Sequence, residues 1–175
     1  IGSMWYSKRF NRVVAMLLAV PGAVLIGDAA RAATLDVCAT CTHTTLNSAF
    51  TAATSGDTIV LDGPTLLTDP PTTYTLTTDL VINAAKNGLE IRGKQASRPD
   101  KIEIVGTGGG PVITVEDDQS FEILGVTIKG GTTGILAMTD SGVEIRRCLF
   151  DGITGIGVNC LDPTNVYIAS SIITN

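Results

Sequence analysis

The sequence predicts an all-β chain that folds as a right-handed parallel β-helix, a solenoid with rungs of about 22 residues. Three stretches predict it: FEILGVTIKG at 121–130, VEIRRCLFDG at 143–152 and VYIASSIITN at 166–175, which begin 22 and 23 residues apart. In each stretch apolar and polar residues alternate with the period of two expected of strands that bury one face. Many short strands separated by Gly-rich turns indicate the same fold class.

Aligned residue by residue, the three stretches form columns of like side chains. The inward columns are Phe121, Val143 and Val166, then Ile123, Ile145 and Ile168. Each stretch closes on Gly130, Gly152 or Asn175, residue types that tolerate a positive φ angle. A chain that returns to the same corner in every rung, with rungs ~4.8 Å apart, produces such columns. A β-sandwich needs no fixed period and a propeller blade takes about 40–50 residues, so the β-helix is favoured.

A single short helix precedes the rungs. Leu46, Ala49, Phe50 and Ala53 recur at helical spacing within residues 46–54, and we expect this helix to cap the first rung and protect its open edge. Residues 33–57 therefore form an N-terminal cap, and residues 58–175 form the rungs. Because the sequence stops at the end of a strand in full register, we expect the C-terminus to be truncated, with more rungs in the complete protein.

Residues 1–32 are expected to be a secretory signal peptide with a short upstream remnant. After Met4 come three basic residues, an apolar stretch at 13–26 and the small-residue site ARA at 30–32. The apolar stretch is 14 residues long, shorter than the ~20 that a spanning helix needs. The sequence thus predicts a secreted or cell-surface protein with no membrane span in the mature chain.

The charge balance excludes one class of partner. The chain has a net charge of −5, and removal of residues 1–32 leaves 8 basic and 16 acidic residues. Nucleic acid is therefore not expected to bind, because its phosphates require Lys and Arg.

Four cysteines follow the predicted signal peptide. Cys38 and Cys41 form a C-x-x-C motif, and export favours a small structural disulfide between them. A zinc site would need distant cysteines, because His43 is the only histidine. Cys148 falls in an inward column and is expected to be an inert apolar residue. It bonds Cys160 only if their Cα atoms lie within ~7 Å.

The segment VCATCTHTTLNSAFTAATSGDTIVL (37–61) resembles the opening segment of secreted right-handed parallel β-helix proteins of the pectate-lyase-like superfamily. In that group a cysteine pair and a capping helix precede the phrase A-x-x-G-D-T-I-x-L. Here the phrase is formed by Ala53, Gly56, Asp57, Thr58, Ile59 and Leu61. The resemblance covers about residues 37–175 and implies the fold and secretion. It does not fix an activity, because the superfamily contains lyases, hydrolases, epimerases and non-catalytic surface proteins.

Aspartates recur in the loops before the three repeats. Asp118, Asp140 and Asp162 are 22 residues apart, and Asp117 lies beside the first. Stacked rungs place these loops on one side, which resembles the way polysaccharide lyases of this fold gather aspartates around Ca²⁺. All four are candidate Ca²⁺ ligands, and Asp118, Asp140 and Asp162 are candidate substrate-binding residues. The favoured alternative is that each Asp begins a turn by accepting a backbone hydrogen bond.

Catalytic residues are not assigned. Arg146 and Arg147 fall at the mid-repeat bend, away from the aspartate loops, and the single histidine precludes a Ser–His or Cys–His pair near Cys148. Outward Glu122 and Glu144 are expected on adjacent rungs. That spacing is too close for an inverting glycosidase, whose carboxyl groups lie ~6.5–9.5 Å apart.

Two functions remain open. The first is an exported, non-catalytic β-helix module that contacts glycans or other cell-surface partners. The second is a lyase or hydrolase acting on acidic polysaccharide. Tyr167, expected to point outward, is a further candidate for sugar contact, and Tyr74 is the only other tyrosine after residue 32. This scarcity of aromatic platforms favours the non-catalytic function, with no cofactor other than the candidate Ca²⁺.

Overall fold

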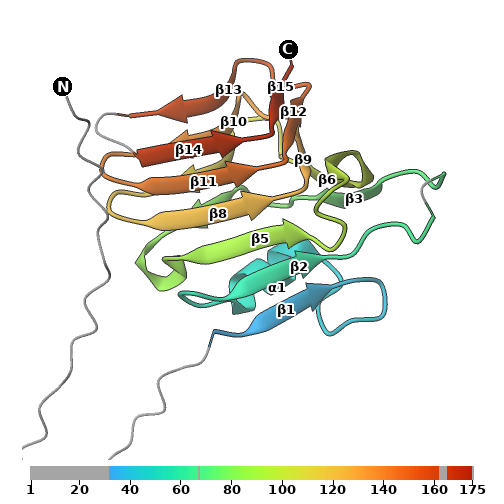
Figure 1. The fold of residues 1–175 in the computed structure, drawn as a ribbon. Coiled ribbons are helices and arrows are strands. Elements are labelled where there is room, and N and C mark those ends of the chain that lie inside the picture. Colours follow the sequence, from blue (N-terminus) through green and yellow to red (C-terminus); the bar gives the residue numbers. More distant parts are fainter. Residues whose placement is uncertain (1–31, 67, 162–164, 175) are drawn as a thin grey trace, which may run out of the picture. The chain divides into compact units, whose positions relative to one another are not determined.

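The computed structural model describes residues 32–66, 68–161 and 165–174. Within these ranges the chain forms the predicted parallel β-helix, with its strands stacked in three sheets (Figure 1). The predicted signal peptide lies outside the described residues except for Ala32, as do Asp162 and Asn175. In the described part of the chain, no helix is long and apolar enough to cross a membrane.

All strand pairs are parallel, and from β2 onward each rung supplies strands to the sheets in the order A, B, C. Sheet A contains β1 (Thr34–Val37), β2 (Thr58–Leu61), β5 (Leu89–Gly93), β8 (Ser120–Leu124), β11 (Gly142–Arg146) and β14 (Asn165–Ala169). Sheet B contains β3 (Thr72–Thr75), β6 (Ile102–Val105), β9 (Thr127–Lys129), β12 (Leu149–Asp151) and β15 (Ile172–Ile173). Sheet C contains β4 (Leu80–Ile82), β7 (Pro111–Val115), β10 (Thr133–Ala137) and β13 (Ile156–Cys160).

The predicted inward columns are confirmed. Phe121, Val143 and Val166 stack in register, as do Ile123, Ile145 and Ile168. The 22-residue period, however, is wrong for the earlier rungs, where Thr58 pairs with Glu90 and Glu90 with Glu122 at a separation of 32 residues. The extra residues lie in the corner loop at 62–71, in the loop at 94–101, which contains the 3-10 helix η2 (Pro99–Lys101), and in the corner that contains the 3-10 helix η1 (Ala84–Lys86). Insertions at corners leave the sheet register unchanged.

A residue with positive φ recurs at each of the three corners. Between sheets A and B these residues are Gly125, Arg147 and Ser170; between sheets B and C, Gly130 and Gly152; between sheets C and A, Asp118 and Asp140. The prediction for Gly130 and Gly152 is therefore confirmed, with φ angles of 69° and 65°. Asp is among the few residue types other than Gly that tolerate this conformation. The corner thus accounts for the 22-residue spacing of Asp118 and Asp140.

The N-terminal cap contains the predicted helix, α1 (Leu46–Ala52), which ends two residues earlier than expected. Its first turn is capped by Thr45, whose side chain accepts a hydrogen bond from the Ser48 N–H. Leu46 and Ala49 are buried in the core cluster. The strand β1 was not predicted, because it is only four residues long and buries a single side chain. It pairs with β2 and extends sheet A by one strand.

The Asp57 carboxylate, just before β2, links the residue that precedes β1 to the residue that follows the C-cap of α1. It is only 5 % exposed and accepts hydrogen bonds from the Ala33 N–H at 2.7 Å, the Thr54 N–H at 2.7 Å and the Thr54 hydroxyl at 2.9 Å. Burial acts to raise the pKa of Asp57, but these hydrogen bonds, with the charge of Lys86, outweigh it and lower the pKa below its ordinary value. Asp57 is thus the buried hydrogen-bond acceptor within the G-D-T-I phrase.

Two of the four cysteines form the predicted disulfide, and the other two are free. Cys38 and Cys41 form a disulfide in the loop after β1. Cys148 and Cys160 are both free, so the possible bond between them is not formed. Cys148 is buried, as expected of an inward column, and this burial raises the pKa of its thiol to about 11, which disfavours the reactive thiolate. Cys160, the last residue of β13, is exposed.

Candidate functional site

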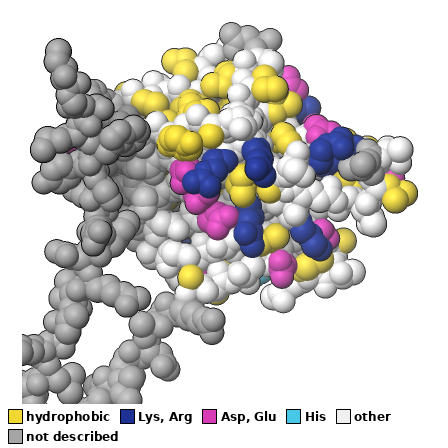
Figure 2. All heavy atoms as spheres, in the orientation of Figure 1, with side chains coloured by type: hydrophobic (Ala, Val, Ile, Leu, Met, Phe, Trp, Pro, Cys, Tyr) yellow, Lys and Arg dark blue, Asp and Glu magenta, His cyan; other side chains and the backbone are white. Residues whose placement is uncertain are grey.

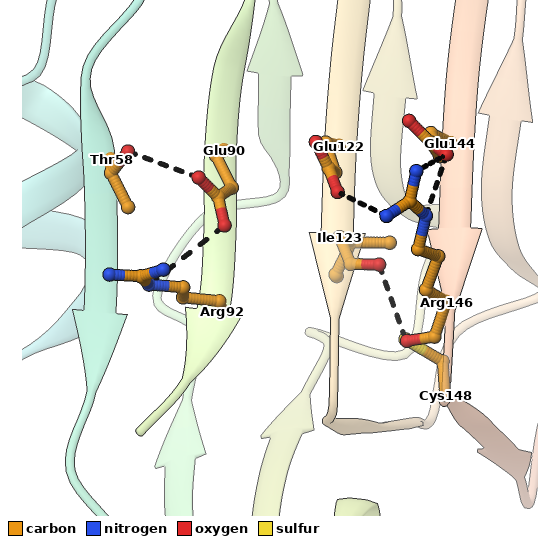
Figure 3. Close-up of polar contacts among 8 residues, drawn as sticks. All are labelled: Thr58, Glu90, Arg92, Glu122, Ile123, Glu144, Arg146 and Cys148. Atoms are coloured by element: carbon orange, nitrogen blue, oxygen red, sulfur yellow. Dashed lines mark hydrogen bonds and ion pairs between the residues drawn. The ribbon is translucent and has the colours of Figure 1, made fainter. Parts of the chain in front are cut away.

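A row of polar side chains follows the outward face of sheet A. Its members pair in register from strand to strand: Thr58, Glu90, Glu122, Glu144 and Tyr167. Figure 3 shows the first four with their partners. The adjacency of Glu122 and Glu144 is as predicted. Glu90 as a third member was missed, although the repeated tetrapeptides LEIR (89–92) and VEIR (143–146) carried the signal.

Two arginines in the next outward column hold these carboxylates. The Arg92 Nε lies 3.8 Å from a carboxylate oxygen of Glu90. Arg146 donates to the Glu144 carboxylate through both Nε and a terminal nitrogen (Figure 3). Its other terminal nitrogen lies 4.0 Å from a carboxylate oxygen of Glu122. Exposed ion pairs of this kind contribute only ~0–1 kcal/mol to stability. Arg146 thus lies between the two carboxylates of adjacent rungs and contacts both.

Glu122 has an altered acidity because of its position in the middle of the row. Partial burial raises its pKa, and the neighbouring charges of Glu144 and Glu90 raise it further. The guanidinium groups of Arg146 and Arg92 oppose this shift without cancelling it. Glu122 therefore takes up a proton more readily than an ordinary glutamate does.

A shallow open hollow of about 420 Å³ lies beside the row. Its polar lining consists of Ser120, Glu122, Glu144, Asn165 and Tyr167. Gly88 and Gly142 also line it, and their lack of side chains leaves the space open. Tyr167, predicted to point outward, is 59 % exposed.

A second hollow, of about 460 Å³, also borders Tyr167. Arg146, Arg147 and Ser170 contribute its polar lining. Arg147 and Ser170 occupy the left-handed corner between sheets A and B, with φ angles of 50° and 52°, where the rung below has Gly125. Tyr167 therefore borders a carboxylate-lined hollow and an arginine-lined one. Figure 2 shows acidic and basic side chains side by side on one face of the molecule.

The predicted loops of Asp118 and Asp140 are neighbours, but among the described residues neither loop lines a hollow. The Asp118 N–H donates to the Thr139 carbonyl at 3.3 Å, which brings the loops of Asp118 and Asp140 together. Asp117, Asp118 and Asp140 are exposed. Among the residues that the structure describes, no three acidic, His or Cys side chains group closely enough to hold a metal ion. Asp162 lies outside those residues, so the calcium site stays a prediction.

Tyr74, the other tyrosine of the described residues, has a structural role. Its hydroxyl donates to the carbonyls of Asp62 at 2.7 Å and Val37 at 3.0 Å. Burial, together with the charge of Asp62, raises the pKa of Tyr74 to about 12. Tyr74 is therefore part of the core, and Tyr167 alone of the two presents its ring to solvent.

Comparisons with known proteins place the fold. No protein-family model and no curated protein matches the sequence. Among solved structures, the pectin methylesterase from Aspergillus niger in deglycosylated form is similar, with a TM-score of 0.50 and 14 % identity over 80 % of this chain. A penultimately deglycosylated form of that enzyme gives a TM-score of 0.49 at 15 % identity. The chain spans 56 % of the length of that enzyme, and at such low identity the likeness shows the parallel β-helix fold alone.

Proposed function

We propose that this chain is an exported, non-catalytic β-helix module that binds glycans on the outward face of sheet A. The observation that carries the proposal is the position of Tyr167, an exposed ring that borders both hollows. A sugar combines an apolar ring face with hydroxyl groups. Tyr167 offers an amphipathic surface for the former, and the charged side chains beside it offer hydrogen bonds for the latter.

The charged neighbours of Tyr167 contact one another. Glu122 and Glu144 present acceptors, whereas Arg146 presents donors and is itself held by both carboxylates. Side chains that are ordered before binding lose less conformational entropy on binding. The stacked rungs also repeat the acceptor at the strand spacing of ~4.8 Å. An extended polysaccharide that lies along the solenoid axis therefore meets the same type of group at successive rungs.

The fold and the N-terminal segment support polysaccharide as the ligand class. The structural neighbour is named a pectin methylesterase, and residues 37–61 resemble secreted proteins of the pectate-lyase-like superfamily. The Cys38–Cys41 disulfide is compatible with an exported protein. One fold hosts many functions, so the ligand must be established at the site itself.

Glycan binding can be tested with the purified chain on neutral, uronate-containing and amino-sugar oligosaccharides. At least one class is expected to bind, and Tyr167→Ala is expected to weaken binding about 30-fold, because truncation of a Tyr anchor costs ~2 kcal/mol. Ile156→Ala is the matched control, because Ile156 is 52 % exposed on β13 but lines neither hollow. Undiminished binding by Tyr167→Ala, or no binding of any class, would contradict the proposal.

The same measurement addresses the predicted calcium site. If Asp117, Asp118, Asp140 and Asp162 hold Ca²⁺ that contacts the glycan, affinity should fall in a chelator and return with added Ca²⁺. An affinity that is equal in both conditions would show that these aspartates shape the corner turns and do not bind Ca²⁺ for glycan recognition.

The second candidate function is hydrolysis of the bound glycan, and the raised pKa of Glu122 favours it. A carboxyl group with a raised pKa, next to a second carboxylate that contacts Arg146, resembles the pairing of a general acid with its partner. Release of reducing ends by the purified chain, abolished in Glu122→Gln, would establish this activity. Glycan binding without bond cleavage would leave the non-catalytic function in place.

A further inference from the structure

The two hollows that Tyr167 borders carry opposite charges. Glu122 and Glu144 line the first, the carboxylate-lined hollow, and none of its described lining residues is basic. Arg146 and Arg147 line the second, the arginine-lined hollow, and none of its described lining residues is acidic. A ligand that covers the Tyr167 ring therefore meets negative charge on one side and positive charge on the other.

The hollows lie on opposite sides of Tyr167 along the strand direction. Gly142 and Asn165, the first residues of β11 and β14, line the carboxylate-lined hollow. Arg146 and Ala169, the last residues of the same strands, line the arginine-lined hollow. Each residue advances a strand by ~3.3 Å, so the two ends of such a strand are ~13 Å apart. Tyr167 is the middle residue of β14 and lies between them.

In each hollow, one charged group keeps free hydrogen-bonding capacity among the described residues. The Glu122 carboxylate lies 4.0 Å from Arg146, beyond hydrogen-bond distance, whereas Arg146 donates to Glu144 (Figure 3). Partial burial raises the pKa of Glu122, and the charges of Glu144 and Glu90 add to this shift, so a cation beside Glu122 is stabilised. On the other side, Arg147 is exposed and forms no ion pair with any described residue.

A sugar unit with a cationic group on one edge and an anionic group on the other matches this arrangement. In a 1,4-linked pyranose chain, the substituents at C2 and C5 of each ring lie on opposite edges of the chain. A chain that runs along the solenoid axis therefore directs them in opposite directions along the strands. A 2-amino-2-deoxyuronate carries an ammonium group on C2 and a carboxylate on C5. A uronate without the amino group has a charged group for only one of the hollows.

We propose that the glycan bound at Tyr167 is zwitterionic, a 1,4-linked 2-amino-2-deoxyuronate whose ammonium group enters the carboxylate-lined hollow and whose carboxylate enters the arginine-lined hollow. This inference rests on the proposed glycan binding and adds the chemical class of the ligand. Glu122 accepts hydrogen bonds from the ammonium group, and Arg147 donates hydrogen bonds to the carboxylate. The Tyr167 ring covers the apolar face of the sugar.

Calorimetric titration of the purified chain with three forms of one oligosaccharide tests this charge pattern. The first form is 1,4-linked 2-amino-2-deoxygalacturonate with free amino groups. The second is the same oligosaccharide after N-acetylation, and the third is the first form after reduction of its carboxyl groups to alcohols. The first form is expected to bind about fivefold more tightly than either of the others, the ratio typical of one exposed ion pair. Salt at about 0.5 M should shrink both ratios, because it screens exposed charges.

Two variants separate the contributions of the two hollows. Glu122→Gln should abolish the advantage of the free amino group and keep that of the carboxylate. Arg147→Gly should do the reverse, and glycine suits the left-handed corner, which Gly125 occupies one rung below. Glu116→Gln is the control, because it removes a charge from an exposed residue that lines neither hollow. This control should leave both ratios unchanged.

The outcomes distinguish the zwitterionic ligand from glycan binding itself. The inference is overturned if the N-acetylated or the reduced form binds as tightly as the zwitterionic form, or if the two variants leave both ratios unchanged. In those cases, binding that still depends on Tyr167 would keep the proposed function in place. Binding of another glycan class alone would have the same meaning, whereas binding of no glycan would overturn both proposals.

Discussion

Gly125→Ala is expected to lower the free energy of unfolding by about 2–5 kcal/mol, through left-handed strain of ~1–2 kcal/mol and overpacking of ~1–3 kcal/mol. Gly125 has a φ of 67°, and an added Cβ would lie against the backbone of Ala96 in the loop between β5 and β6. That loop is one of the insertions that lengthen the earlier rungs. Backbone atoms have no rotamer by which to move away, so the clash must displace the loop or the corner.

Gly152→Ala is the matched control for this change. Gly152 has a φ of 65°, but an added Cβ would meet nothing within 4 Å. Only the conformational strain of ~1–2 kcal/mol is therefore expected. Urea denaturation of both variants compares the two costs directly. Equal losses at the two positions would show that the contact between the corner and the Ala96 loop is not present.

Asp57→Asn is expected to destabilise the chain by about 2–5 kcal/mol at neutral pH. Three donors converge on the Asp57 carboxylate, from the Ala33 N–H and from both the N–H and the hydroxyl of Thr54. An amide has one acceptor oxygen, so its NH₂ group must face one of these donors. The buried position leaves no water to replace the lost hydrogen bond. Asp117→Asn, which removes the same charge from an exposed corner, is expected to have little effect.

The sign of the pH dependence gives a second test of Asp57. Its pKa is lower in the folded chain than its ordinary value of 3.8, so its contribution is complete above that value and is lost as the pH falls through the folded pKa. The difference in unfolding free energy between wild type and Asp57→Asn should therefore shrink in acid below pH 3.8. A difference that stays constant there would show that the carboxylate is not hydrogen-bonded as described.

The register of the later rungs could be predicted from sequence because three consecutive rungs have corner loops of nearly equal length. Ile123, Ile145 and Ile168 then align without any gap. The earlier rungs could not be predicted so well, because insertions at 62–71 and 94–101 hide the spacing between Thr58, Glu90 and Glu122. Apolar and polar residues alternate within each strand of these rungs as well, so the strands themselves could be predicted from the sequence.

The candidate site could be predicted from the sequence only in part. The column that contains Glu122, Glu144 and Tyr167 follows from register alone, and the structure places these residues as expected. The hollows do not follow from register, because they depend on the glycines beside the row and on the left-handed corner at Arg147. The aspartate repeat was the strongest sequence signal, and the positive φ of Asp118 and Asp140 gives it a structural cause.

The central claim, that glycans bind on the outward face of sheet A, is tested most directly by an NMR titration of the chain with the oligosaccharide that binds most tightly. The amide signals of Ser120, Glu144, Asn165 and Tyr167 are expected to shift together, with a common saturation curve, while those of sheets B and C stay in place. Shifts that cluster on sheet B or sheet C, or on the cap around Cys38, would contradict the account.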